Sequence, residues 1–243
     1  MSEDSYRYED IAGLIDHALL GPTLDAAALE EGIHLAMDYA VASVCIAPHY
    51  LARARELLRG TGVRATTTVG FPHGTSSTSA KLDEARHALG DGAEELDVVV
   101  NVGRVLGSDW NYVTEELRAL TEFTQARDGK IKVIFENSYL DEPHKLRLCE
   151  LCGTIGVDWV KTSTGYGPGG ATLADVKLMR EHSPPSVAVK AAGGVKTLDE
   201  LLELRPYITR CGLSRTRDIL DDCRRRLGLA RITTTDGPPP GDY

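Results

Sequence analysis

The sequence is poor in aromatic residues, in basic residues and in long hydrophobic runs, and each shortage excludes a class of protein. Aromatic side chains make up 6% of the 243 residues, and 27 Lys and Arg face 36 Asp and Glu, giving a formal net charge of −9. Nucleic-acid-binding surfaces are normally basic, so this balance argues against a nucleic-acid partner. No apolar run approaches the roughly 20 residues of a membrane-spanning helix, and the polar residues 1–10 are unlike a signal peptide. We therefore expect a soluble, cytoplasmic protein without a membrane partner.

Cysteine and histidine are few and form no clear metal-binding pattern. The five Cys are an odd number, which fits reduced thiols better than a disulfide framework. Cys149 and Cys152 form a C-x-x-C pair that could be a redox pair or half of a zinc site. They lie within a helical stretch without a second such pair, which favours packing in the core. The seven His include no H-E-x-x-H motif. We therefore expect no metal and no cofactor.

Short β-branched runs alternate with longer amphipathic stretches along the chain. The runs predict strands at residues 13–16, 42–46, 63–69, 95–101, 130–136, 157–162, 186–191 and 207–212. The stretches between them predict helices opening near residue 25 and near Pro143, and at residues 76–90, 110–127, 172–181, 197–204 and 216–227. Repeated strand–helix units imply parallel strands with right-handed crossovers.

Eight such units in about 250 residues predict an α/β fold consisting of a single TIM barrel. The main rival is a doubly wound sheet, which usually has a glycine-rich phosphate turn after its first strand. Residues 16–20 (Asp-His-Ala-Leu-Leu) follow the first strand here instead. No linker divides the chain. We therefore expect an N-terminal segment at 1–10, a barrel domain at 11–230 and a flexible tail at 231–243.

Four of the predicted strands carry charged residues that we expect to point into the barrel. Lys161 ends the sixth strand and Lys190 ends the seventh. Asp97 lies within the fourth strand, and Asp16 ends the first. Active sites of such barrels lie at the carboxyl ends of the strands, and buried Lys and Asp need partners. One inward lysine could be a structural ion pair, but two lysines with two acids favour a catalytic site.

Two neighbouring lysines suit carbonyl chemistry through an imine. A lysine amine has a reference pKa of about 10.4, and a second cation about 4 Å away would lower it by roughly three pH units at an effective dielectric near 20. Burial acts in the same direction. Lys161 or Lys190 could then attack a carbonyl, and the iminium would accept electrons from a breaking carbon–carbon bond. Asp97 fits the role of moving the protons.

Many of the 24 glycines follow the last three predicted strands. Loops after the seventh and eighth strands of a barrel often bind phosphate, and glycine lets backbone amides approach it. This pattern predicts a phosphorylated substrate, although the glycines could simply serve turns. The candidate substrate-binding residues around these loops and the barrel mouth are Cys45, Thr164, Gly165, Gly193, Gly194, Gly212, Ser214 and Arg215.

A nicotinamide-dependent oxidoreductase is the alternative from a different class. Gly165, Gly167 and Gly170 have the spacing of the dinucleotide-binding fingerprint. That fingerprint needs an acidic residue about 20 positions later, at the end of the next strand. The next strand carries Lys190 there, and this alternative would leave two buried lysines unexplained.

Six motifs in order resemble the deoxyribose-phosphate aldolase family, over residues 11–227. The motifs are residues 14–17 (Leu-Ile-Asp-His), 43–48 (Ser-Val-Cys-Ile-Ala-Pro), 68–72 (Thr-Val-Gly-Phe-Pro), 96–101 (Leu-Asp-Val-Val-Val-Asn), 160–165 (Val-Lys-Thr-Ser-Thr-Gly) and 189–194 (Val-Lys-Ala-Ala-Gly-Gly).

The resemblance implies a class I aldolase with a TIM-barrel fold that works without a metal. It implies reversible cleavage of 2-deoxy-D-ribose 5-phosphate to D-glyceraldehyde 3-phosphate and acetaldehyde. In the family, the lysine matched by Lys161 forms the Schiff base and the one matched by Lys190 tunes its pKa. The acids matched by Asp97 and Asp16 serve proton transfer, and the position of Cys45 lines the pocket.

The chain departs from the family pattern at the barrel mouth. Ala18 replaces a threonine, and Arg215 replaces the second of two serines at the end of the eighth strand. Arg215 could be a strong phosphate ligand or a solvated surface charge. A paralogue acting on another aldehyde or sugar phosphate therefore remains an alternative. A further hypothesis is that Tyr243, at the tip of the tail, reaches the mouth and assists proton transfer. The sequence leaves assembly into a homo-oligomer open.

Overall fold

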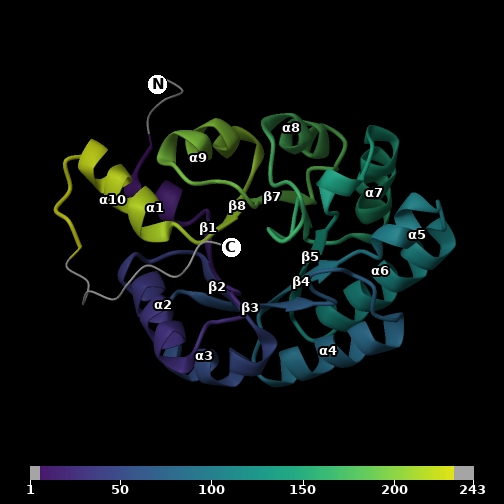
Figure 1. Cartoon of the computed structure of the whole chain (residues 1–243), viewed down its shortest axis with the longest axis horizontal. Coiled ribbons are helices and arrows are strands. Elements are labelled where there is room, and N and C mark those ends of the chain that lie inside the picture. Colours follow the sequence, from purple (N-terminus) through teal and green to yellow (C-terminus); the bar gives the residue numbers. More distant parts are fainter. Residues whose placement is uncertain (1–5, 233–243) are drawn as a thin grey trace.

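The computed structural model describes residues 6–232, which form a closed barrel of eight parallel strands (Figure 1). Each strand pairs with the next, and β8 pairs with β1. The prediction of a single (β/α)8 barrel is confirmed. The strands are β1 (Ile15–Leu19), β2 (Ser43–Ile46), β3 (Arg64–Val69), β4 (Glu95–Val99), β5 (Lys130–Ile134), β6 (Trp159–Lys161), β7 (Ala188–Ala192) and β8 (Arg210–Leu213).

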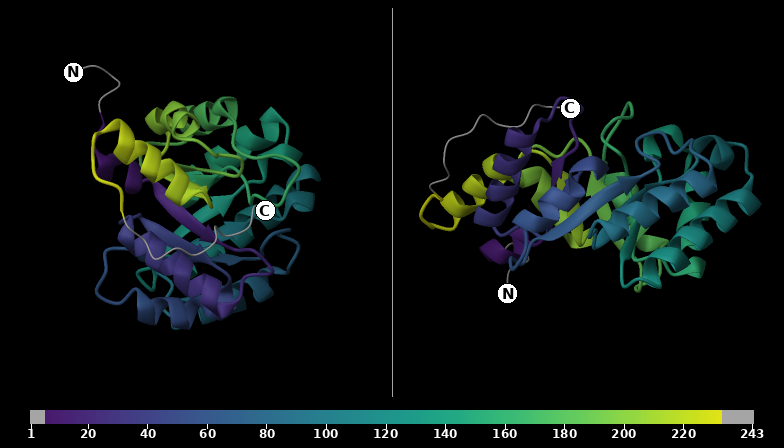
Figure 2. Two further views of the ribbon diagram at one scale, coloured as in Figure 1. Left: turned by 60° about the vertical axis from the view of Figure 1, so that its left-hand side comes forward. Right: turned by 90° about the horizontal axis from the view of Figure 1, so that it is seen from below.

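Helices surround the barrel, as two further views show (Figure 2). They are α1 (Tyr8–Ala12), α2 (Ala26–Asp38), α3 (Leu51–Leu57), α4 (Thr78–Gly90), α5 (Val102–Leu106), α6 (Trp110–Gln125), α7 (Glu142–Ile155), α8 (Leu173–Glu181), α9 (Leu198–Leu204) and α10 (Thr216–Arg226). Three short 3-10 helices, Pro48–Tyr50, Asn137–Tyr139 and Arg205–Tyr207, complete the described elements.

Side chains of the sequence cap most of the longer helices. The Asp25 carboxylate accepts a hydrogen bond from the amide of Ala28 at the start of α2, 2.9 Å away. The Thr197 hydroxyl accepts a hydrogen bond from the Glu200 amide at the start of α9, and the Thr197 amide donates one to the Glu200 carboxylate. These two bonds form a capping box. Such caps satisfy amides that have no partner within the helix. They explain why helix starts were predicted to within about two residues.

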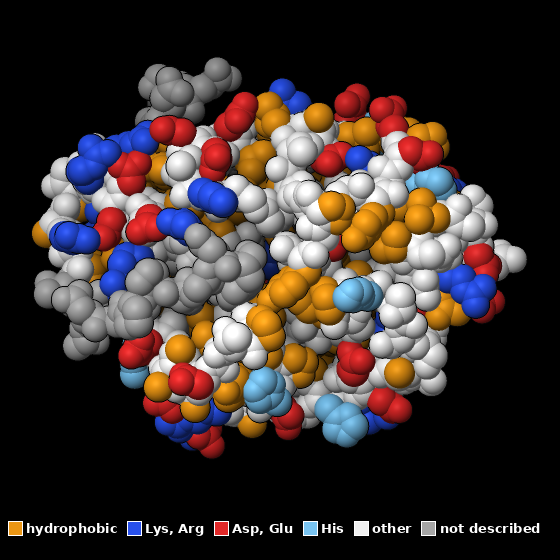
Figure 3. Space-filling view, viewed as in Figure 1, with side chains coloured by type: hydrophobic (Ala, Val, Ile, Leu, Met, Phe, Trp, Pro, Cys, Tyr) orange, Lys and Arg blue, Asp and Glu red, His pale blue; other side chains and the backbone are white. Residues whose placement is uncertain are grey.

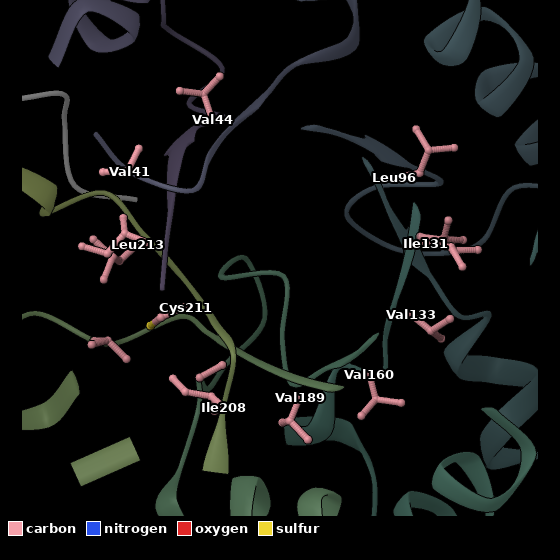
Figure 4. Close-up of a cluster of buried hydrophobic side chains, with 14 of the residues drawn as sticks. Val41, Val44, Leu96, Ile131, Val133, Val160, Val189, Ile208, Cys211 and Leu213 are labelled. Carbon is pink, nitrogen blue, oxygen red and sulfur yellow. The ribbon is translucent and has the colours of Figure 1, made fainter. Parts of the chain in front are cut away.

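The apolar core lies between the strands and the helices. Successive side chains of a strand point to opposite faces, so one set from each strand faces outward. Figure 4 shows outward residues of this kind, including Val44, Leu96, Val133, Val160 and Val189, directed toward the surrounding helices. All five are fully buried. The alternate set points into the barrel, where the charged residues lie.

Two strands differ from their predicted limits by three residues at one end, and the others by at most two. The first was expected to end at Asp16, but β1 continues to Leu19, so Asp16 lies inside the barrel and not at its rim. The eighth was expected from residue 207, but Tyr207 belongs to a 3-10 helix and β8 begins at Arg210. Pro206 explains this second difference because it fixes the local turn. Helices α1, α3 and α5 were not predicted from the sequence.

The C-x-x-C pair packs in the core as expected. Cys149 and Cys152 lie in α7 and are fully buried, and all five cysteines are free thiols. Burial raises the pKa of the Cys149 thiol to about 11. The predicted tail and the hypothesis about Tyr243 fall almost entirely outside the described residues. The boundaries at residues 10 and 230 stay predictions, although α1 begins inside the segment set apart at the N-terminus.

Candidate active site

Four side chains predicted to be catalytic meet inside the barrel. The Lys161 ammonium lies 2.6 Å from Oδ2 of Asp97, and the Lys190 ammonium lies 2.8 Å from the same oxygen. Lys190 also lies 2.6 Å from Oδ2 of Asp16. The strand register brings this about because Lys161 and Lys190 are directly paired between β6 and β7. All four residues are 3% exposed or less.

A third lysine, Lys132 of β5, belongs to the same cluster and was missed by the sequence analysis. Its ammonium lies 3.0 Å from Oδ1 of Asp97 and 3.8 Å from Oδ2 of Asp16, and it is also paired with Glu95. The signal was present, because Lys132 interrupts an apolar strand just as Asp97 does.

Lys161 is the lysine best suited to be neutral. Burial lowers its pKa below the ordinary value, and Lys190 acts in the same direction, while Asp97 opposes both. Burial is thus the larger cause, where the sequence analysis had placed the neighbouring cation first. Burial also acts on Lys190, but Asp16 and Asp97 outweigh it and raise the pKa of that ammonium. The cluster therefore contains a lysine prone to lose its proton beside one that keeps it.

Both aspartates of the cluster are held as carboxylates. Burial alone would raise the pKa of Asp97, but Lys132, Lys161 and Lys190 outweigh it and hold that pKa well below its usual range. Burial likewise opposes Lys190, Lys132 and Arg210 at Asp16, whose pKa is lowered to about 2. Asp97 therefore contacts both Lys161 and Lys190 as an anion, and it can accept a proton only transiently.

A cavity of about 250 Å³ opens above this cluster. Asp97 lies below the cavity, in contact with the lysines, and the other predicted site residues line it. The lining residues are Asp16, Ala18, Leu20, Cys45, Lys161, Thr164, Gly165, Tyr166, Lys190, Ala192, Gly193, Gly194, Val195, Lys196, Gly212, Leu213, Ser214 and Arg215. The geometry thus gathers every sequence-predicted site residue in one place.

Several glycines of the site have a packing role as well. A Cβ on Gly170 would lie 2.3 Å from the carbonyl oxygen of Gly193, so the loops after β6 and β7 touch backbone to backbone. A Cβ on Gly212 would lie 3.2 Å from Cε of Lys190, so this glycine makes room for the lysine. Gly165 and Gly193 have φ values of +88° and +81°, which other residues rarely adopt. Part of the glycine pattern therefore serves the turns.

Cys45 and Thr164 both line the cavity; Cys45 presents a neutral thiol, and Thr164 is hydrogen-bonded to Glu136. Burial raises the pKa of the Cys45 thiol to about 11, so it is a neutral, weakly polar wall. The Thr164 amide donates to the carboxylate of Glu136 at 3.3 Å, and its hydroxyl is bonded to the same group. Glu136 has a left-handed backbone (φ +59°) and anchors the start of the loop after β6.

Two cationic side chains lie on the β7–β8 side of the cavity. Arg215 lines it while its guanidinium also lies 3.4 Å from Asp218. Lys196, which the sequence analysis missed, lies on the same wall. Many of the Lys and Arg on the mouth face lie toward α10, which follows β8 (Figure 3). Ala18 presents a methyl group to the cavity where a hydroxyl was expected from the family pattern.

Comparison with known proteins agrees with this geometry. A family model described as DeoC/LacD family aldolase matches residues 11–219, most of the chain. The chain belongs to this aldolase family. A deoxyribose-phosphate aldolase of Rhodopirellula baltica is 55% identical over 231 residues, which cover 95% of this chain and 96% of the relative. One from Clostridium perfringens is 41% identical over 85% of this chain and 92% of its own length.

A solved structure supports the same membership of the aldolase family. The tetrameric deoxyribose phosphate aldolase of Aeropyrum pernix superposes with a TM-score of 0.83 at 29% identity, covering 90% of this chain and 92% of its own. The chain is therefore a lyase with the barrel fold of its family. Among residues 6–232, no helix is long and apolar enough to cross a membrane.

Proposed function

We propose that this aldolase reversibly cleaves 2-deoxy-D-ribose 5-phosphate to D-glyceraldehyde 3-phosphate and acetaldehyde through an imine on Lys161. The observation that carries the proposal is the Lys161–Asp97–Lys190 contact at the base of the cavity. It combines a lysine whose pKa is lowered with a retained cation and a carboxylate. No cofactor is needed for this chemistry, because the lysine itself provides the electron sink.

The reaction begins with attack of the neutral Lys161 amine on the C1 aldehyde of the open-chain sugar. Loss of water from the resulting carbinolamine gives an iminium. Removal of the proton from the C3 hydroxyl then breaks the C2–C3 bond, and its electron pair moves into the iminium. D-Glyceraldehyde 3-phosphate departs and leaves a two-carbon enamine on Lys161. Protonation at C2 and hydrolysis release acetaldehyde and restore the amine.

Asp97 and Lys190 support these proton transfers. Asp97 lies within hydrogen-bond distance of both lysines and, directly or through a water it holds, receives the proton that the substrate hydroxyl gives up. Lys190 stays charged and stabilises negative charge that develops on the reacting oxygens. Asp16 holds Lys190 in place from β1.

The phosphate group binds on the β7–β8 side of the cavity. Gly193 and Gly194 offer backbone amides, Ser214 offers a hydroxyl, and Lys196 and Arg215 supply positive charge. This local charge is needed because the chain as a whole carries −9 and repels an anionic substrate.

Borohydride trapping tests the imine. Incubation with acetaldehyde and sodium borohydride should leave one ethyl group on Lys161, detected by peptide mass spectrometry. The Lys161→Arg variant is the control and should stay unmodified at every lysine of the cavity. An unmodified Lys161 in the wild-type protein would overturn the proposal.

Titration with NADH, monitored by its fluorescence, tests the oxidoreductase alternative. We expect no binding of NADH.

The Ala18 methyl in the cavity wall favours one second candidate. A paralogous aldolase with another aldehyde or sugar phosphate as substrate would need no hydroxyl there. Steady-state comparison of 2-deoxyribose 5-phosphate with 2-deoxyribose separates the two. A large preference for the phosphate ester supports the first proposal, and equal efficiencies support the paralogue. We also propose that the enzyme acts in the cytoplasm as a homo-oligomer, as the tetrameric relative from Aeropyrum pernix suggests.

A further inference from the structure

Ion pairs inside the barrel join residues of six strands into one connected set, which we call the interior network. Every member contacts at least one oppositely charged member within 4 Å; the Lys161–Asp97 contact is 2.6 Å and the longest, Lys132–Asp16, is 3.8 Å. The network consists of three carboxylates and four cationic side chains: Asp16, Glu95, Asp97, Lys132, Lys161, Lys190 and Arg210.

Formal charges leave this network with one cation in excess. An excess buried charge is costly, and a lysine can relieve it by losing a proton, whereas an arginine cannot. Among residues 6–232, Lys132 contacts three carboxylates and Lys190 contacts two, whereas Lys161 contacts only that of Asp97. The proton of Lys161 is therefore the least stabilised. Loss of that proton makes the network neutral and produces the amine that the reaction needs.

Glu95 and Arg210 belong to the network but lie outside the cavity lining. A guanidinium nitrogen of Arg210 lies 3.3 Å from Oε1 of Glu95, and its Nε lies 3.1 Å from Oδ1 of Asp16. Glu95 is 1% exposed, and Arg210 lies over the ring of Trp159, 5.5 Å from its centroid. In barrel order, β4 and β8 each lie two strands from β6. Neither residue lines the cavity, and each lies on a strand two places from that of Lys161.

We propose that Glu95 and Arg210 are positioning residues that set the protonation state of Lys161 through the charge balance of the interior network. Removal of either residue changes the net charge of the network by one, in opposite directions. Without Arg210 the network would be neutral with Lys161 protonated, so the amine would hold its proton more tightly. Without Glu95 two cations would be in excess, so the proton would leave more easily. The inference rests on the proposed role of Lys161.

Other titratable or charged groups near Lys161 do not alter this balance. Cys45 of β2 is a neutral thiol, since burial raises its pKa to about 11. Arg64 of β3 reaches Glu95 at 3.4 Å, but its side chain is 52% exposed, so solvent screens it. Glu136, after β5, makes no ion pair within 4 Å with a member of the network, and its carboxylate accepts hydrogen bonds from the amide of Thr164. Lys196 and Arg215 line the mouth of the cavity and make no ion pair with a member of the network.

The test is the pH dependence of kcat/KM in Glu95→Gln and Arg210→Gln variants. The acidic limb of the profile reports ionisation of Lys161 in the free enzyme. Charges two strand spacings apart, about 10 Å, at an effective dielectric near 20 change a pKa by about one unit. Arg210→Gln should move the limb about one unit to higher pH, and Glu95→Gln about one unit to lower pH. The rate of borohydride trapping with acetaldehyde should show the same shifts.

Two further variants separate charge from structure. Arg210→Lys keeps the charge and should leave the limb within a few tenths of a pH unit of the wild type. The double variant Glu95→Gln/Arg210→Gln restores the original net charge of the network and should return the acidic limb to its wild-type position. If both single variants shift in the same direction, or neither shifts, the proposal is overturned. If Arg210→Gln fails to fold, Glu95→Gln and the double variant still decide. Failure to label Lys161 in the wild-type protein would instead overturn the proposed function.

Discussion

At the scale of single residues, the barrel interior holds more charge than a core normally tolerates. Lys132, Lys190 and Asp97 are each 1% exposed or less, and each has oppositely charged partners within 3.0 Å. Removing one partner of a buried pair typically costs about 3–5 kcal/mol, because the other charge is left uncompensated. These residues are therefore mutually dependent, and single substitutions report on the network as well as on the residue replaced.

Gly212→Ala tests how closely Lys190 is positioned. The added Cβ would lie 3.2 Å from Cε of Lys190 and 3.3 Å from Cβ of Ala192, so the lysine must move by a few tenths of an ångström. Misplacement of a catalytic group by such amounts is costly, and we expect about a tenfold loss in kcat at pH 7. Gly62→Ala is the control, because a Cβ there meets no atom within 4 Å. Equal kcat values for the two variants would contradict the prediction.

His17 gives the fold a specific dependence on pH. Its side chain is fully buried, and Nδ1 lies 2.8 Å from Oγ1 of Thr216. Burial lowers the pKa of His17 to about 4, whereas the unfolded chain has a value near 6.5. Below pH 6.5 the unfolded state therefore binds a proton that the folded state does not, and about 3 kcal/mol of stability is lost by pH 4.

The His17→Gln variant should lose most of this pH dependence. Urea unfolding at pH 7, 5.5 and 4 measures the free energy of unfolding, and the difference between wild type and variant should shrink as the pH falls. Thr216→Val is the control, since it removes the hydrogen bond but keeps the buried imidazole. It should lower stability at every pH with the wild-type slope. A wild-type slope in His17→Gln would show that other groups govern this range.

At the scale of elements, the loop after β6 connects three parts of the mouth. The hydroxyl of Tyr166 donates to the carbonyl oxygen of Leu20 at 2.8 Å, after β1. Its ring meets Phe71, after β3, edge-on with centroids 5.4 Å apart. The base of the loop is fixed by Thr164 and Glu136. Tyr166 thus sets the shape of the cavity from a loop that also follows Lys161, the proposed Schiff-base lysine.

Tyr166→Phe and Tyr166→Ala should affect binding more than chemistry. A neutral hydrogen bond contributes about 0.5–1.5 kcal/mol, so Tyr166→Phe should raise KM for 2-deoxyribose 5-phosphate about two- to tenfold with kcat kept within twofold. Tyr166→Ala also loses the ring contact and should raise KM further. Steady-state kinetics of both variants checks this order. An unchanged KM in Tyr166→Ala would show that the loop is held without this side chain.

Element limits were predictable where a local signal marks them. Caps such as Ser77, Asp141 and Thr172 lie directly before their helices, because their side chains bind the first free amides. The length of β1 was not predictable, since Leu19 and Leu20 fit a strand or a loop equally well. Five-residue helices such as α1 and α5 carry too few turns for a periodic pattern. Their positions follow from tertiary packing.

At the scale of the whole molecule, the sequence predicted the barrel and the meeting of Lys161, Lys190, Asp97 and Asp16 because strand ends of a parallel barrel share one mouth. It did not predict the other three members of the interior network, Glu95, Lys132 and Arg210. Contacts between β4 and β8, such as Glu95 with Arg210, cross the barrel and join positions that no local spacing relates. Such contacts follow only from the three-dimensional arrangement of all eight strands.

The opposition between whole-molecule charge and local charge predicts an unusual salt dependence. The chain carries −9, which repels a phosphate ester, whereas the proposed phosphate site contains the cations Lys196 and Arg215. The screening length is about 30 Å at 0.01 M salt, about 10 Å at 0.1 M and about 3 Å at 1 M. Raising salt to 0.1 M should therefore relieve the distant repulsion first and increase kcat/KM for 2-deoxyribose 5-phosphate. A further rise to 1 M should weaken the local attraction and lower it again.

Unphosphorylated 2-deoxyribose is the matched control, because it has no charge for either field to act upon. Its kcat/KM should stay within about twofold over the whole range, which would exclude an effect of salt on the fold or on the lysines. The ratio of the two substrates then isolates the phosphate. A ratio that falls steadily from the lowest salt would mean that attraction by the cavity's cations outweighs repulsion by the net charge at every salt concentration. A ratio that only rises with salt would contradict the assignment of Lys196 and Arg215 to the phosphate site.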